Sequence, residues 1–174
     1  MLKTKDLALI GLYTALLIGG QVALSSISGV EIVTLLFASF CFYFGVIHGV
    51  LLGNVFSLLR CLVFGFFPNV LILYLIYYNL FAVVMGLIGK AMNREVNLKK
   101  TLLVIFITLC FTALFTLLDN VITPLYYAYN FESAKAYAMA SLFALIPQEI
   151  CTLITMGTLF IPLVKLFERI KPIK

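Results

Sequence analysis

Residues 101–118 read Thr-Leu-Leu-Val-Ile-Phe-Ile-Thr-Leu-Cys-Phe-Thr-Ala-Leu-Phe-Thr-Leu-Leu, a stretch without a single charged side chain. About 20 mainly apolar residues in a helix cross the hydrocarbon core of a bilayer, so this stretch, extended to residue 120, predicts one span. The whole chain of 174 residues has the same character, because 64% of it is hydrophobic and only 11% is charged. One soluble core could not bury so much apolar surface. We therefore expect an all-α integral membrane protein.

Breaks in the apolar pattern divide the chain into six predicted spans within one domain, residues 1–174. Small polar residues at 25–29 end the first span, and the apolar run from 31 to 67 is too long for one helix. We place a turn around His48 within that run, and Pro68 interrupts the next one because proline cannot continue the hydrogen-bond ladder. Pro124 and the polar segment 130–133 predict a longer loop at 121–135. The predicted helices lie near residues 6–24, 31–45, 48–65, 70–92, 101–120 and 136–166.

The basic residues set the expected orientation. Ten of the twelve lie in three stretches, at 3–5, 90–100 and 165–174. Lysine and arginine mark the cytoplasmic ends of spans, so both termini are expected in the cytoplasm, and six spans place the 90–100 loop there too. If residues 31–66 formed one span, the chain would have five spans and one basic terminus would lie outside. We expect a multi-pass protein of the cell membrane, of the bacterial plasma-membrane type, with its first segment retained as a helix; a cleaved signal peptide is the alternative.

Tyrosines gather in the half of the bundle that this orientation places outside. Seven of the nine fall there, whereas an aromatic belt at the lipid headgroups would occupy both interfaces. Tyr74 and Tyr78 also share a helix face at i, i+4 spacing. A belt needs no ligand, but the one-sided distribution favours a pocket lined by some of these rings.

Scarce charges within or at the rim of the spans point to the same half. A charge at the middle of a membrane costs at least about 2.5–3.5 kcal/mol, so it needs a partner or a wet cavity. Arg60 could pair with Asp119 or Glu149 as a structural lock, or these groups could line an outward-facing solute site. An ion pair can also form part of the wall of a pocket, so both hypotheses remain open. The candidate solute-binding residues are Glu31, Arg60, Asn69, Tyr74, Tyr78, Asn79, Asp119, Asn120, Tyr127, Gln148 and Glu149.

Motifs for catalysis, metal binding and nucleic-acid binding are missing. The chain has no H-E-x-x-H and no G-x-S-x-G, and residues 86–91 have the wrong spacing for a phosphate-binding loop. His48 has no histidine or carboxylate at i±3 or i±4, and the four cysteines form no C-x-x-C pair. No basic stripe is interleaved with aromatic residues, so we expect no nucleic-acid partner. We expect no enzyme, no cofactor and no bound metal, and energy for any uphill transport from a gradient or a partner.

The first predicted helix carries a stripe of small residues, Gly11, Ala15 and Gly19, at intervals of four. Such a stripe lets another helix approach closely, either from the same chain or from another subunit. The stripe and the surrounding segment 5–16 resemble the S components of energy-coupling-factor (ECF) vitamin transporters, six-helix proteins with an Ala-x-x-x-Ala type motif on helix one. Residues 140–149 are similar to a proline-containing stretch on helix six of that family, although the commoner Pro-Phe-Asp and His pattern is absent.

The resemblance implies a substrate-binding subunit that captures a vitamin or vitamin-like small molecule at its outer face. The stripe of Gly11, Ala15 and Gly19 would dock on a transmembrane coupling subunit that is driven by two ATPase subunits. Riboflavin, a pyridine vitamin, a queuine-type base and a corrinoid are all compatible with tyrosines and an arginine. The alternatives are a structural membrane scaffold of the cell-shape (MreD-like) type and a membrane-embedded enzyme. Besides its protein partners, the chain should contact membrane lipid and a small molecule.

Overall fold

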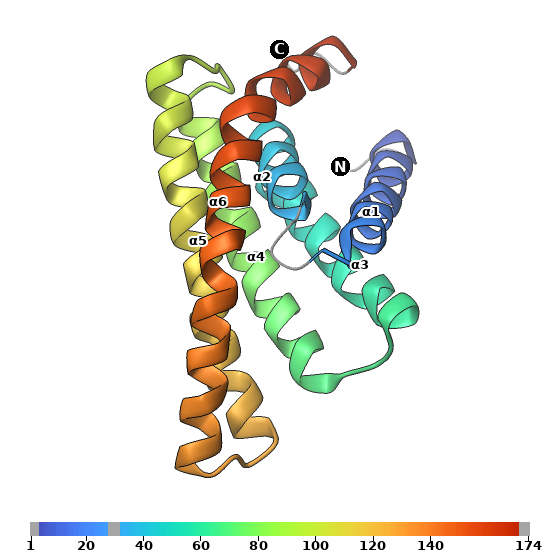
Figure 1. Ribbon diagram of the computed structural model, residues 1–174. Helices are drawn as coiled ribbons and strands as arrows, with labels where there is room; N and C mark the ends of the chain where they lie inside the picture. Colours follow the sequence, from blue (N-terminus) through green and yellow to red (C-terminus); the bar gives the residue numbers. More distant parts are fainter. Residues whose placement is uncertain (1–3, 28–31, 171–174) are drawn as a thin grey trace.

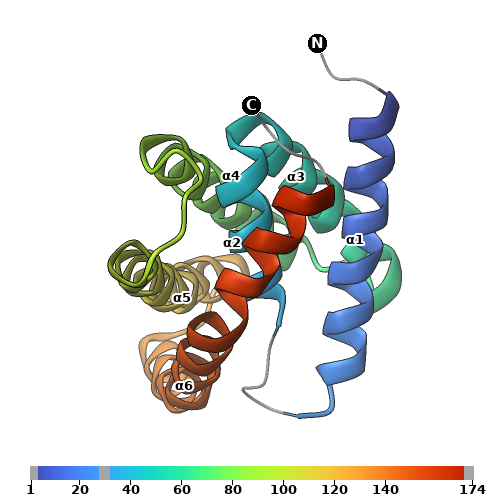
Figure 2. The same cartoon turned by 90° about the horizontal axis from the view of Figure 1, so that it is seen from above.

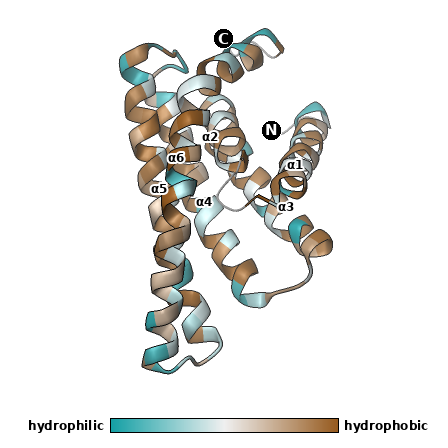
Figure 3. Ribbon diagram, in the orientation of Figure 1, coloured by the Kyte–Doolittle hydropathy of each residue, from teal (hydrophilic) through white to brown (hydrophobic). Residues whose placement is uncertain are grey.

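The computed structural model describes residues 4–27 and 32–170, and within them the chain is all-helical, as expected, with no β-strand (Figure 1). Five of the helices, all except α2, are long and apolar enough to cross a membrane. Figure 3 shows apolar residues covering most of their length. The helices are α1 (Thr4–Leu24), α2 (Val33–Phe44), α3 (Val46–Phe64), α4 (Pro68–Ala91), α5 (Leu98–Tyr126) and α6 (Phe131–Ile170).

Helix α2 is the central element of the bundle. It has 12 residues and all of them are buried, whereas the other helices expose apolar side chains. A helix of this length is about 18 Å long, shorter than the roughly 30 Å hydrocarbon core. The view along the bundle shows α2 surrounded by its neighbours (Figure 2). Because protein rather than lipid surrounds α2, its length does not have to match the thickness of the bilayer.

The turn between α2 and α3 lies earlier than the sequence predicts. Gly45 alone forms it, with φ of 85°, a conformation that favours glycine, and His48 lies inside α3 rather than in a turn. One residue of positive φ is enough to end α2, because the next helix starts immediately at Val46. The expected bounds of 31–45 and 48–65 are corrected accordingly.

The predicted loop at 121–135 is also mostly helical. Helix α5 continues through Pro124, which falls in its last turn, and only residues 127–130 separate α5 from α6. Asn130 begins α6, because its side-chain Oδ1 accepts a hydrogen bond of 2.8 Å from the backbone N–H of Ser133. The 40 residues of α6 extend for about 60 Å, so the α5–α6 hairpin projects beyond the other helices (Figure 1).

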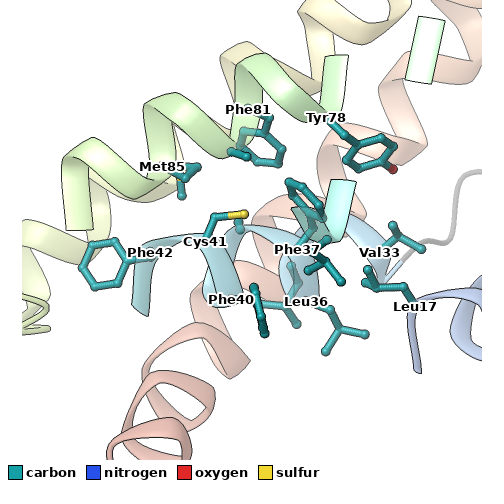
Figure 4. Close-up of a cluster of buried hydrophobic side chains, with 14 of the residues drawn as sticks. Leu17, Val33, Leu36, Phe37, Phe40, Cys41, Phe42, Tyr78, Phe81 and Met85 are labelled. Atoms are coloured by element: carbon teal, nitrogen blue, oxygen red, sulfur yellow. The ribbon is translucent and has the colours of Figure 1, made fainter. Parts of the chain in front are cut away.

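Aromatic rings fill the centre of the bundle between α2 and α4 (Figure 4). Phe37 is fully buried, and its ring centre lies 4.7 Å from that of Tyr78 and 5.8 Å from that of Phe81. Glycines on α4 allow this close approach: an added Cβ at Gly89 would overlap the carbonyl oxygen of Phe42, and one at Gly86 would meet the backbone nitrogen of Val46. The contact between α4 and the α2–α3 turn is therefore backbone against backbone.

The two ends of the bundle differ in charge. Both ends of the described chain and the α4–α5 connection lie at the same end, opposite the α3–α4 and α5–α6 connections (Figure 1). We call this the basic end, and its described cations are Lys5, Lys90, Arg94, Lys99, Lys100, Lys165 and Arg169. Among the described residues, only Arg60 and Lys135 are cations outside it.

Candidate functional site: a ring-lined pocket

All six helices contribute to one cavity of about 360 Å³. Its walls come from the C-terminal parts of α1 and α3 and the N-terminal parts of α2 and α4, which all point away from the basic end. Phe115 of α5 and Gln148 of α6 complete the lining. The pocket therefore lies in the half of the bundle that does not carry the basic clusters.

Three tyrosines from α4 form one wall of the pocket. Tyr74 and Tyr78, both expected from the sequence, are joined by Tyr77, and all three are buried. The ring centres of Tyr74 and Tyr78 are 5.2 Å apart, and Tyr77 lies 4.9 Å from Phe115. These contacts make a continuous aromatic surface. Tyr77 belongs to the seven tyrosines of the outer half but was not singled out as a candidate, although its position three residues after Tyr74 places it on nearly the same helix face.

Arg60 of α3 is the cation of the pocket. Its guanidinium carbon lies 4.4 Å from the ring centre of Tyr74 and 5.0 Å from that of Phe64. Among the described residues, no carboxylate oxygen lies within 4.0 Å of its nitrogens, and its buried Nε has no hydrogen-bond partner. A structural lock with Asp119 or Glu149 is therefore not formed.

Gln21 of α1 is a pocket residue that the sequence reasoning missed. Its Nε2 donates a hydrogen bond of 3.2 Å to the Tyr74 hydroxyl, and its buried Oε1 has no partner among the described residues. The sequence did carry a signal for it, because Gln21 is the one amide in the mainly apolar first span and buried polar groups in membrane helices need partners. Gln148, which was expected, lines the pocket from α6.

Four of the other candidates belong to polar contacts between helices rather than to the pocket lining. Asn69 donates to the Thr123 hydroxyl at 3.1 Å, and Thr123 donates to Asp119 at 2.7 Å. Tyr137 donates to the second carboxylate oxygen of Asp119 at 2.5 Å, so Asp119 has partners from its own helix and from α6. The remaining two contacts are Ser141 to Asn120 at 2.7 Å and Asn79 to Asn54 at 2.9 Å.

Two of the last three candidates, Tyr127 and Glu149, also lie apart from the lining that the structure describes. Tyr127 is 49% exposed in the α5–α6 turn, where its ring stacks on that of Tyr129. Glu149 follows Gln148 on α6 but is not among the lining residues. Glu31 lies outside the described residues.

The small-residue stripe of α1 faces away from the bundle. Gly11, Ala15 and Gly19 are all exposed, and a Cβ added to either glycine would meet nothing within 4 Å. The buried face of α1 carries larger side chains instead, among them Tyr13 and Leu17. Within the described residues, the stripe is therefore not used for packing inside the chain.

His48 has a carboxylate neighbour that sequence spacing could not show. Its Nε2 lies 3.9 Å from the carboxylate of Asp6, which comes from α1. Metal sites in proteins usually need three or four such ligands, and no group of three His, Cys, Asp or Glu residues occurs among the described residues. Asp6 and His48 therefore form a contact between α1 and α3 at the basic end.

Comparison with known proteins identifies no relative. No family model, no curated protein and no solved structure matches the chain. The pocket and the charges at the two ends are therefore the features of this membrane-type bundle that bear on its function.

Proposed function

We propose that the chain is the substrate-binding subunit of an ATP-driven importer of the ECF type, capturing a vitamin-like small molecule at the outer face of a bacterial plasma membrane. The observation that supports this most is the pocket of about 360 Å³ to which every helix contributes. Small-molecule sites are concave, lined mainly by apolar and aromatic side chains with a few polar groups, and measure about 300–1,000 Å³. The pocket fits that description, because its lining includes five aromatic rings (Phe64, Tyr74, Tyr77, Tyr78 and Phe115) and, as polar groups, Arg60, Gln21 and Gln148.

The charges at the two ends support the orientation in this proposal. Lysine and arginine accumulate at the cytoplasmic ends of spans, so the basic end and both termini face the cytoplasm. The chain then crosses the membrane six times, with α2 making its crossing inside the protein. In this orientation the pocket faces the outside, where a solute would be captured.

Energy for uptake comes from partner subunits in this proposal. The chain lacks a phosphate-binding loop, so two ATPase subunits and a transmembrane coupling subunit would supply the work. The exposed stripe of Gly11, Ala15 and Gly19 offers the coupling subunit a flat surface on α1, where small residues allow close helix packing.

Blocking the stripe is expected to separate the chain from its partners without unfolding it. Gly11→Leu places a side chain where the structure has open space, so the melting temperature should stay within about 2 °C of wild type. The same side chain should prevent a partner helix from packing, and recovery of the ATPases with the affinity-purified protein should fall about tenfold or more. Quantitative mass spectrometry of the purified complex measures the coupling subunit and the ATPase subunits.

The matched control is Gly157→Leu on α6, which also points into open space. It should leave recovery of the ATPases unchanged. Equal recovery with wild type and Gly11→Leu would contradict docking through the stripe, and co-isolation of cell-wall machinery in place of ATPases would favour a scaffold.

Cysteine labelling is expected to place the two ends of the bundle on opposite sides of the membrane. A membrane-impermeant maleimide should label Glu132→Cys, an exposed position in the first turn of α6, in intact cells. Lys99→Cys, exposed at the basic end, should react only after the cells are permeabilised. The wild-type protein, with its four native cysteines, gives the background. The reverse pattern would place the pocket on the cytoplasmic side and contradict capture from outside.

A further inference from the structure

The charge of the pocket points to the kind of molecule it takes. The guanidinium of Arg60 remains protonated in proteins, so the positive charge is permanent. Every other lining residue that the structure describes is neutral, and none is Asp or Glu. An arginine in a half-buried position within a membrane protein needs a compensating group. No described lining residue is a carboxylate that could supply it, so water or a bound anion that enters the pocket can do so.

The rings of Tyr74 and Phe64 only partly stabilise this cation. They interact with the guanidinium through their π faces, which stabilises a cation less than a paired carboxylate does. Neither ring accepts a conventional hydrogen bond through its face, and the buried Nε of Arg60 has no partner among the described residues. A guanidinium presents its N–H donors in a planar fork that matches the two oxygens of a carboxylate. The guanidinium of Arg60 is therefore in place to bind a carboxylate.

The wall next to Arg60 fits the remainder of the ligand. Tyr74, Tyr77, Tyr78 and Phe115 form a continuous surface of rings, with neighbouring centres 4.9–5.7 Å apart. Offset stacking between aromatic rings favours a flat, unsaturated body over a saturated one. Gln21 lies beside this wall, and its buried Oε1 has no partner among the described residues. An amide can donate to or accept from a ring heteroatom.

We propose that the pocket selects an organic anion, a carboxylate carried on a flat aromatic or heteroaromatic ring system, with Arg60 binding the carboxylate and the tyrosine wall stacking on the ring. This deepens the proposed function and rests on it, since it narrows the solute from vitamin-like to an aromatic carboxylate. Glu31 precedes Ile32, a lining residue, and lies outside the described residues, so the selectivity is tested in the full chain with Glu31 in place.

Matched pairs of probes test the charge directly. The purified full-length protein is titrated with nicotinate and nicotinamide, indole-3-carboxylate and indole-3-carboxamide, and 2-naphthoate and 2-naphthamide, following the melting temperature and the heat of binding. In at least one pair the carboxylate should bind about tenfold more tightly than its amide, the usual effect of a hydrogen bond to a charged group. Arg60→Gln should remove that preference, and Arg60→Lys, which keeps the charge but not the fork, should retain part of it.

Lys135→Gln is the matched control, because it removes one positive charge from the same half of the bundle at an exposed position on α6. It should leave the preference for carboxylates unchanged. Equal affinity for both members of every pair, a preference that survives in Arg60→Gln, or no binding by any carboxylate would overturn the proposal.

Small molecules extracted from the purified protein separate this inference from the proposed function. An aromatic anion that co-purifies with wild type and Lys135→Gln but not with Arg60→Gln supports both. A neutral or cationic solute in the pocket would overturn the proposed selectivity for anions but not the importer function. If an anionic lipid were the only species that co-purifies with wild type and is lost in Arg60→Gln, the aromatic carboxylate would be overturned. Binding of carboxylates without any co-isolated ATPase would support the carboxylate selectivity of the pocket and contradict the proposed importer function.

Discussion

Gly89→Ala is expected to destabilise the bundle more than any other single methyl group added to α4. A Cβ at this position would overlap the carbonyl oxygen of Phe42 in α2, and the atom it meets is backbone, which cannot rotate away as a side chain can. Adding atoms to a close-packed contact costs about 1–3 kcal/mol when side chains can adjust, so we expect about 3 kcal/mol or more here. The free energy of unfolding in a titration of mixed micelles with a denaturing detergent measures this loss.

Gly157→Ala on α6 provides the control with the identical chemical change. A Cβ there meets nothing within 4 Å. Alanine favours a helix over glycine by about 1 kcal/mol, so this variant should be as stable as wild type or slightly more stable. If Gly89→Ala were as stable as Gly157→Ala, α4 would not lie against the end of α2 as the structure has it.

The fold followed from the sequence wherever an apolar run ended at a clear break. The expected helices 6–24 and 70–92 differ from α1 and α4 by two residues or fewer at each end, because charge or proline marks the limits of these runs. The turn at Gly45 was less predictable, since Gly49 is an equally good local candidate. Packing decides between them, because Gly49 is needed inside α3, where a Cβ would meet the sulfur of Cys41.

The α5–α6 connection shows a different limit. Pro124 predicts a break, but α5 continues through it and ends two residues later at Tyr126. The proline removes one backbone N–H donor from the last turn, which shortens the continuation of the helix rather than ending it at once. The real signal was Asn130, whose side chain caps the start of α6. Reading the polar residues at 130–133 as a helix start rather than as a loop would have given the right boundary.

The pocket could be predicted only in part. Arg60, Tyr74, Tyr78 and Gln148 were identifiable because charges, hydroxyls and amides are scarce in such an apolar chain. The expected Asp119 lies elsewhere because Thr123 and Tyr137 satisfy its carboxylate. Phe115 could not be singled out among apolar neighbours, because a helix that is apolar all round does not reveal which face turns inward.

Phe37→Ala is the second substitution with a large expected effect. Phe37 is completely buried. Its ring packs edge-on against that of Tyr78 and stacks with that of Phe81. Within a membrane, buried side chains stabilise a bundle by van der Waals contact, so removing this ring leaves a cavity whose walls lose their partners. We expect the free energy of unfolding to fall by about 3–5 kcal/mol, measured by the same detergent titration.

Phe143→Ala separates burial from residue type, because Phe143 on α6 is 74% exposed and lipid can replace the contacts of its ring. It should change the free energy of unfolding by less than about 0.5 kcal/mol. Phe37→Ala should in addition weaken binding in the pocket, since Tyr78 lines the pocket on one side and is held by Phe37 on the other. A stable Phe37→Ala together with an unstable Phe143→Ala would mean that the outer face of α6, not α2, forms the centre of the packed structure.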